Sequence, residues 1–90
     1  MRKEDILDVF RNEEFDAQSD KIVYLFLCFN ENEGLSSKYI SKELNMTDRT
    51  IKRSIKRLKE KGFIEIERRQ TEDGGSNSNV FHILKEGDHL

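Results

Sequence analysis

Positively charged side chains recur at helical spacing in residues 47–61. If this segment is a helix whose buried side carries Ile51, Ile55 and Leu58, the opposite side is basic. Guanidinium groups bind phosphates or guanine edges through two parallel hydrogen bonds, and ammonium groups hold phosphates by charge. The spacing therefore predicts a helix face that binds a polyanion. Its members are Arg49, Arg53 and Lys56, flanked by Arg57 and Thr50.

The formal net charge of −2 is distributed unevenly along the 90 residues. Residues 1–20 carry three basic and seven acidic groups (−4), whereas residues 47–69 carry nine basic and four acidic groups (+5). A local excess of this size is typical of a nucleic-acid-binding face. An isolated basic helix face is more often simply solvated, so the neighbouring elements must decide between the two interpretations.

The N-terminal part of the chain predicts two helices. The first covers residues 3–11. A second helix is expected from Ser19, as its N-cap, to about residue 32. Its apolar run, residues 22–29, is also compatible with a buried strand, but its length favours a helix that is covered on more than one side. Phe15 is the one large apolar group of the connection between them. The first helix places on one side Ile6, Leu7, Val9 and Phe10.

Two further helices are expected after Gly34. Ser36 or Ser37 caps the first, and Asn45 tolerates the left-handed conformation that reverses the chain. Thr47 caps the basic helix, and Gly62 ends it. The first of these two short helices directs into the core Tyr39, Ile40 and Leu44.

A β-hairpin is expected after Gly62. Two strands are predicted, at residues 63–68 and 80–84. Apolar and charged residues alternate in the first segment, and the second is a largely apolar segment that can pair with it. The intervening residues 70–79 are rich in turn formers and predict the hairpin loop. Short helix, turn, basic helix and hairpin therefore follow one another directly.

This order resembles the winged helix-turn-helix family over residues 18–84. The fold class that it implies is α+β, mainly α, with a three-helix core and a β-hairpin wing. Residues 1–17 are expected to form an extra N-terminal helix and connection, and residues 85–90 are expected to be a flexible tail. Ser54 departs from the family's usual apolar residue, and Ile55 is expected to take its place in the core. The helix-turn-helix spacing is carried by Ile40, Ser41, Leu44, Asn45, Met46 and Ile51.

The resemblance implies that the partner is double-stranded DNA, with the helix at about 47–61 in the major groove and the wing on the flanking groove or backbone. It implies a transcriptional regulator, similar to MarR-like repressors, or a replication initiator module of the phage or plasmid type. Base and phosphate contacts are expected from Thr47, Arg49, Thr50 and Arg53, and more peripherally from Lys56 and Arg57. Phosphate contacts are expected from Ser36, Ser37 and Lys38, and wing contacts from Arg68, Arg69 and Asn77.

Other classes of function have little support in the sequence. We expect no enzyme, no cofactor and no metal, because Cys28 is the only cysteine and His82 alternates with apolar residues on a strand. No apolar run is long enough for a membrane span, and we expect a cytoplasmic protein. A twofold homodimer through the N-terminal helices is expected, since one domain reads few base pairs. The alternative function is a winged helix that contacts protein, as an interaction module or as an antagonist of a DNA-binding protein.

Overall fold

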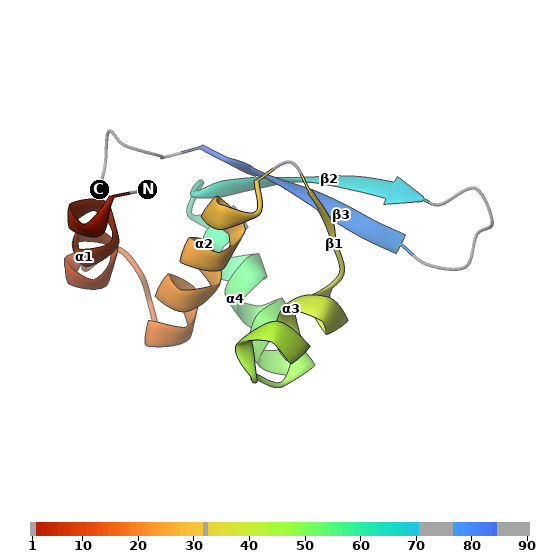
Figure 1. Ribbon diagram of the computed structural model, residues 1–90, viewed down its shortest axis with the longest axis horizontal. Coiled ribbons are helices and arrows are strands. Elements are labelled where there is room, and N and C mark those ends of the chain that lie inside the picture. The colour runs from red at the N-terminus through yellow and green to blue at the C-terminus, as the bar shows by residue number, and fades with distance from the viewer. Residues whose placement is uncertain (1, 32, 71–76, 85–90) are drawn as a thin grey trace.

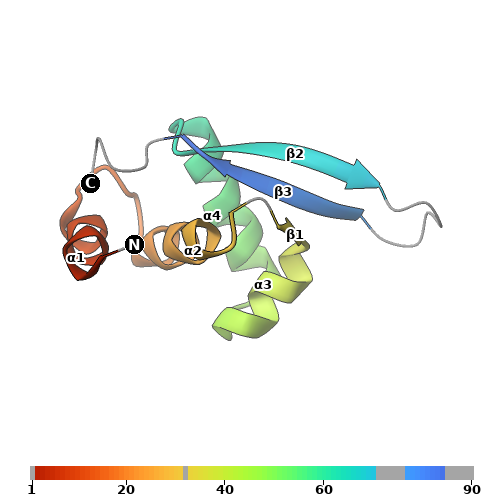
Figure 2. The same ribbon diagram turned by 45° about the horizontal axis from the view of Figure 1, so that its top comes forward.

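The computed structural model describes residues 2–31, 33–70 and 77–84. In the described chain, helices α2, α3 and α4 gather beside one end of a small antiparallel sheet, and the β2–β3 hairpin extends beyond them (Figures 1 and 2). Helix α1 lies at the end of the molecule opposite the hairpin. This is the winged helix-turn-helix fold that the sequence predicts. The elements are α1 (Lys3–Arg11), α2 (Gln18–Phe29), β1 (Gly34–Leu35), α3 (Ser37–Leu44), α4 (Asp48–Glu60), β2 (Ile64–Gln70) and β3 (Asn77–Ile83).

The caps of α3 and α4 lie where the sequence predicts them. Ser36 Oγ accepts a hydrogen bond from the backbone N–H of Tyr39 at 3.1 Å, and Thr47 Oγ1 accepts one from that of Thr50 at 3.2 Å. Between the helices, Asn45 adopts a left-handed conformation with φ of 54°. Asparagine tolerates this conformation better than most residues, so the chain reverses without a glycine.

Helix α2 has different ends from those expected. It begins at Gln18, after Ala17, so the prediction that Ser19 is the N-cap is wrong. The Ser19 hydroxyl lies inside the first turn and accepts a hydrogen bond from Ser54 Oγ at 3.2 Å, which is a contact with α4 that sequence spacing does not reveal. The helix ends at Phe29 rather than near residue 32, because the Asn30 side chain donates to the carbonyl of Phe26 at 2.8 Å and closes the last turn.

The sheet has the strand order β1-β3-β2. Strands β2 and β3 pair from Ile64↔Ile83 to Gln70↔Asn77, so the hairpin extends further than the predicted strands 63–68 and 80–84. The two residues of β1 pair with Val80 and Asn79, a strand too short to give an alternating pattern in the sequence. Because β1 directly precedes α3, it attaches the wing to the helix-turn-helix. Most of the expected loop, and the expected tail at 85–90, lie outside the described residues.

The core lies between α2, α4 and the base of the sheet. Phe15 stacks on Phe63 with ring centroids 4.4 Å apart, and Tyr24 meets the edge of Phe63 at 5.5 Å. Phe15, the one large apolar group of the connection between α1 and α2, therefore anchors that connection on the core. Val23, Tyr24 and Leu27 are fully buried, so the apolar helix α2 is covered on several sides, as its composition requires.

Tyr39 is the residue of α3 that departs from expectation. Ile40 is fully buried, but Tyr39 is 46% exposed, so its predicted inward orientation is wrong. Its hydroxyl donates to Glu43 Oε1 at 3.1 Å, and this hydrogen bond, with the charge of Glu43, raises the pKa of Tyr39. The phenol keeps a polar partner at the surface, which an inward orientation would remove.

An ion pair joins α2 to α4. The Nε and Nη2 atoms of Arg57 donate to the two carboxylate oxygens of Asp20, each at 2.8 Å. The pKa of Arg57 is raised, first by this hydrogen bonding and also by the charges of Asp20 and Asp16. Asp20 is almost completely buried, so the guanidinium neutralises a carboxylate that water does not reach. Lys61 adds an ion pair to Asp16 at 2.9 Å, and α4 is fixed on this side by both contacts.

We predict that Arg57→Ala lowers the free energy of unfolding by about 3 kcal/mol, because it leaves the Asp20 carboxylate buried without its counter-ion. Urea denaturation followed by far-UV circular dichroism measures the change. The matched control is Arg49→Ala on the exposed side of the same helix, for which the loss is about 0.5 kcal/mol or less. Equal losses in the two variants would show that the ion pair has no special role.

Candidate nucleic-acid interface

The buried side of α4 is formed by Ile51, Ser54 and Leu58, which are all almost completely buried. Ile55 is only partly buried, so its expected place in the core belongs to Ser54. A serine is accommodated there because its hydroxyl bonds to Ser19. Relative to the predicted orientation, the inward direction of α4 is rotated by about 30°. This rotation brings two lysines that the prediction left out onto the exposed side, Lys52 and Lys59.

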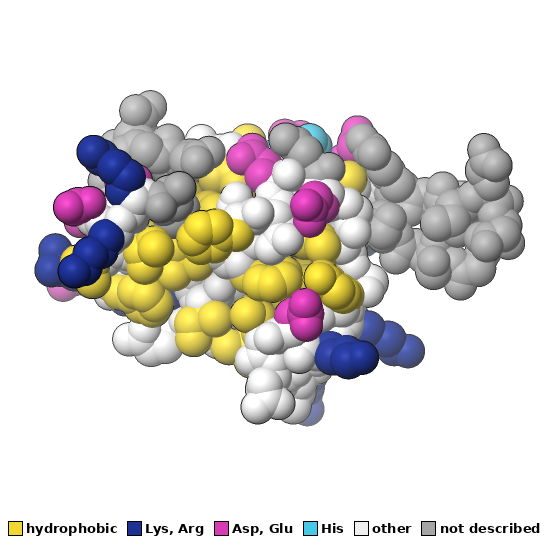
Figure 3. Space-filling view, in the orientation of Figure 1, with side chains coloured by type: hydrophobic (Ala, Val, Ile, Leu, Met, Phe, Trp, Pro, Cys, Tyr) yellow, Lys and Arg dark blue, Asp and Glu magenta, His cyan; other side chains and the backbone are white. Residues whose placement is uncertain are grey.

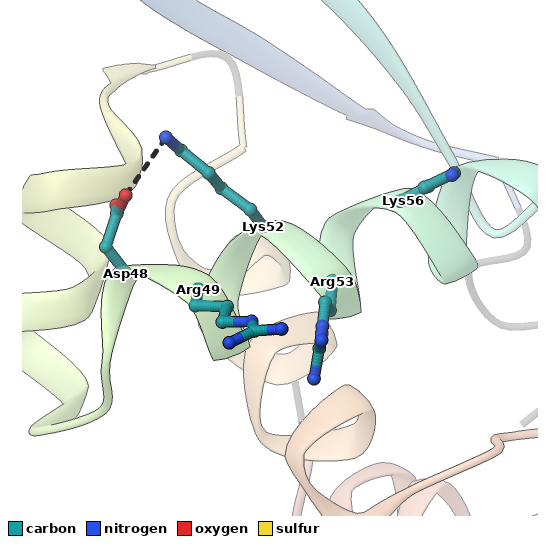
Figure 4. Close-up of a pocket in the computed structure, with 5 residues that line it drawn as sticks. All are labelled: Asp48, Arg49, Lys52, Arg53 and Lys56. Atoms are coloured by element: carbon teal, nitrogen blue, oxygen red, sulfur yellow. Dashed lines mark ion pairs between the residues drawn. The ribbon is translucent and has the colours of Figure 1, made fainter.

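The exposed side of α4 carries cations on both of its flanks. Arg49, Lys52, Arg53 and Lys56 are all exposed and, with Asp48, line a shallow hollow of about 410 Å³ along the helix. Figure 4 shows Arg49 and Arg53 directed to one side of α4 and Lys52 directed to the other. The predicted basic stripe therefore exists, but it is wider than expected and divides into an arginine flank and a lysine flank.

Asp48 is the carboxylate of this surface, and the sequence prediction assigned it no role beyond the helix dipole. Its Oδ2 atom lies 3.0 Å from Lys52 Nζ, as the dashed line in Figure 4 marks. The neighbouring side chains of Ser37 and Lys52 lower the pKa of Asp48, so the carboxylate is ionised at neutral pH. In the free protein, Lys52 therefore already has an anionic partner.

A second groove separates α4 from the wing. It has a volume of about 340 Å³ and brings together side chains from α3, α4, β2 and β3. Two residues predicted to contact the partner, Ser37 and Arg68, meet Lys56 there. Lys52, Lys56 and Lys59 follow one another at four- and three-residue spacing, a signal that would have found the two missed lysines. The groove is lined by Ser37, Lys52, Ile55, Lys56, Lys59, Ile66, Arg68 and Asn79.

The other predicted site residues have varied surroundings. Thr47 and Thr50 share a hydrogen bond between their hydroxyls at 2.8 Å, in addition to the cap, so both belong to the start of α4. Ser36 serves as the cap of α3, and Lys38 is exposed in its first turn. Arg69 and Asn77 lie in the paired backbone of β2 and β3, and their side chains lie outside the described part of the structure.

Arg57 differs from its expected role at the interface. Two of its nitrogens donate to Asp20, and its side chain is only 32% exposed. The prediction placed Arg57 at the edge of the basic stripe. Because α4 is rotated relative to the predicted orientation, Arg57 faces α2. Arg57 therefore holds α4 against α2, and its expected contact with DNA stays a prediction.

Two other features bear on the function. Across residues 2–31, 33–70 and 77–84, no three His, Cys, Asp or Glu side chains gather to hold a metal ion. Within those same limits, none of the helices has the length and apolar character needed to cross a bilayer. Cys28 is partly buried beside the core, and His82 lies on β3 with its Nε2 atom 3.9 Å from Glu67 Oε2.

Comparison with known protein families gives one match. A family model described as an HTH domain matches residues 19–74, which is more than half of the chain and extends from α2 to beyond β2. No match was found among the curated proteins or the solved structures. The matched region contains α3, the Asn45 turn and α4 with its cationic face. The chain therefore belongs to the helix-turn-helix family of DNA-binding domains, in its winged form.

Proposed function

We propose that the protein binds a specific sequence in double-stranded DNA and regulates transcription from it. In this proposal α4 enters the major groove, where Arg49 and Arg53 contact base edges, and the wing lies along the flanking backbone. The observation that carries the proposal is the exposed side of α4, on which five Lys and Arg side chains outnumber the two carboxylates at its ends, Asp48 and Glu60.

The fixed position of α4 supports the proposed role. Its inward side is buried, and the contacts Arg57–Asp20, Ser54–Ser19 and Lys61–Asp16 hold its C-terminal half against α2 and the segment before α2. A helix held in this way presents its arginines without a large ordering cost on binding. Side chains that hydrogen-bond to base edges need such placement, because a misplaced donor does not discriminate between bases.

A homodimer through α1 and α2 is part of the proposal. Leu7, Phe10 and Phe29 are 37%, 42% and 61% exposed. Figure 3 shows hydrophobic side chains gathered over α1 and α2 on one face of the molecule. A second copy covering this face would give a twofold protein that matches a palindromic DNA site.

The function is tested by selecting DNA fragments from a random pool with the wild-type protein at two salt concentrations. We expect enrichment of a discrete sequence, and at the higher salt concentration a marked loss of affinity, because phosphate contacts release counter-ions. The position of this sequence in the genome, at promoters or at a replication origin, distinguishes regulation of transcription from initiation of replication. Retention of no duplex DNA would contradict the proposal and favour the protein-binding alternative.

Arg53→Ala is then measured on the selected fragment. We expect a loss of about 1 to 3 kcal/mol in binding, which is roughly 5- to 150-fold in Kd, because one base contact is removed. On an unrelated duplex the loss is smaller. The matched control is Lys3→Ala in α1, which leaves both affinities unchanged. A gel-shift titration in which Arg53→Ala binds both duplexes as the wild type does would exclude Arg53 from base recognition.

We predict a dimer in sedimentation velocity at tens of micromolar protein. Phe29→Ser shifts the protein toward the monomer, because it places a hydroxyl in the apolar face that the partner covers. Leu84→Ser, at a residue that is similarly exposed after β3, is the control and keeps the dimer. A wild-type monomer at this concentration would contradict the proposed assembly.

A further inference from the structure

An aromatic pair reaches the surface where side chains of α2 and α3 meet. The rings of Phe26 in α2 and Tyr39 in α3 have centroids 6.4 Å apart and planes inclined at 50°. Phe26 is partly buried against the core, whereas Tyr39 is exposed. The core therefore ends on this side in two rings, one of which leaves much of its aromatic surface in contact with solvent.

Two carboxylates lie beside the exposed ring. Glu43 Oε1 accepts a hydrogen bond from the Tyr39 hydroxyl at 3.1 Å, and Glu33 directly precedes β1. The hydrogen bond and charge of Glu43 raise the pKa of Tyr39, and the charge of Glu33 adds to this effect, so both carboxylates act on the same phenol. Within the described part of the chain, neither glutamate has an ion-pair partner. Phe26, Glu33, Tyr39 and Glu43 are called the Tyr39 surface below.

The Tyr39 surface differs in charge from the surface proposed for DNA. On the face shown in Figure 3, hydrophobic side chains continue from α1 over α2 toward α3, and carboxylates stand beside them in the middle of the face. Lys and Arg side chains stand toward the ends of this face. Carboxylates without a neutralising cation repel phosphates and attract cations. The partner that complements the Tyr39 surface is therefore a cation with an apolar or planar part.

We propose that the Tyr39 surface binds an arginine side chain of a partner protein. A guanidinium group is planar and always charged, stacks on aromatic rings, and donates parallel hydrogen bonds to carboxylates. Phe26 and Tyr39 supply the rings, and Glu33 and Glu43 supply the acceptors. A lysine ammonium suits the site less well, because it is more strongly hydrated and has no planar face to stack. This contact is separate from DNA binding and gives the proposed regulator a second surface, for protein.

The probe is a short peptide in which arginines alternate with leucines, titrated into the full chain. A comparison peptide carries citrulline in place of each arginine, which keeps the shape of the side chain and removes its charge. NMR chemical shifts of amides and aromatic rings locate the binding. We expect the arginine peptide to shift the rings of Phe26 and Tyr39 and the amides of Glu33 and Glu43, and the citrulline peptide to leave them unchanged.

Variants separate the rings from the carboxylates. Tyr39→Leu weakens binding of the arginine peptide by about 2- to 5-fold, because it removes a ring and keeps an apolar side chain. Tyr39→Phe restores the ring and binds as the wild type does. Glu43→Gln weakens binding by up to about fivefold. The matched control is Glu4→Gln in the more acidic N-terminal segment, which leaves the affinity unchanged. Circular dichroism verifies that each variant is folded.

Three results would overturn the proposal. Shift changes confined to α1 would mean that the peptide follows the acidic charge of the N-terminal segment. Equal losses in Glu4→Gln and Glu43→Gln, or equal binding of the citrulline peptide, would deny the surface its role. We expect Tyr39→Leu to sediment as the wild type does, and dissociation of this variant would assign the surface to a second copy of the chain. Tyr39→Leu and Glu43→Gln keep the wild-type affinity for the selected duplex, so failure here is distinct from failure of the proposed function.

Discussion

The ion pair between Arg57 and Asp20 is the contact on which the orientation of α4 depends. It joins a buried carboxylate of α2 to a guanidinium of α4. Its two hydrogen bonds of 2.8 Å fix the orientation of the guanidinium relative to the carboxylate as well as their separation. With Ser54 bonded to Ser19 on the same side, α4 has one rotational setting against α2. The composition of the exposed side follows from that setting, because a rotation by one residue would exchange lysines for core residues.

This geometry explains how a protein with a net charge of −2 presents a surface for a polyanion. In the acidic N-terminal segment, the carboxylates of α1 lie at the end of the molecule opposite the wing (Figure 1), whereas the exposed cations lie on α4 and β2. Asp16 and Asp20 of that segment neutralise the two basic groups that fix α4, Lys61 and Arg57. The basic residues thus divide into those that hold the helix and those that remain exposed.

The sequence predicts the helices and strands well where a local signal marks them. It predicts poorly which side chains are buried where a tertiary contact determines the burial. Ser36, Asn45 and Thr47 are found by their local chemistry, and the order of helices and hairpin follows from periodicity. The sequence does not reveal that Ser54 enters the core, since its burial depends on Ser19, 35 residues away. In the sequence, Arg57 cannot be distinguished from the other basic residues of the stripe, because its partner Asp20 is 37 residues away. The prediction leaves out the groove residue Lys59, because it assigned the inward direction of α4 from aliphatic residues alone and so did not count Ser54 as buried.

The central claim is that the side of α4 opposite its buried face is the surface that meets DNA. Titration of ¹⁵N-labelled protein with the selected duplex, followed by backbone amide chemical shifts, tests this claim most directly. The account predicts that the largest shift changes occur from Thr47 to Lys59 and in the β2–β3 hairpin, with little change in α1. Changes concentrated on α1 and α2, with α4 unaffected, would contradict it.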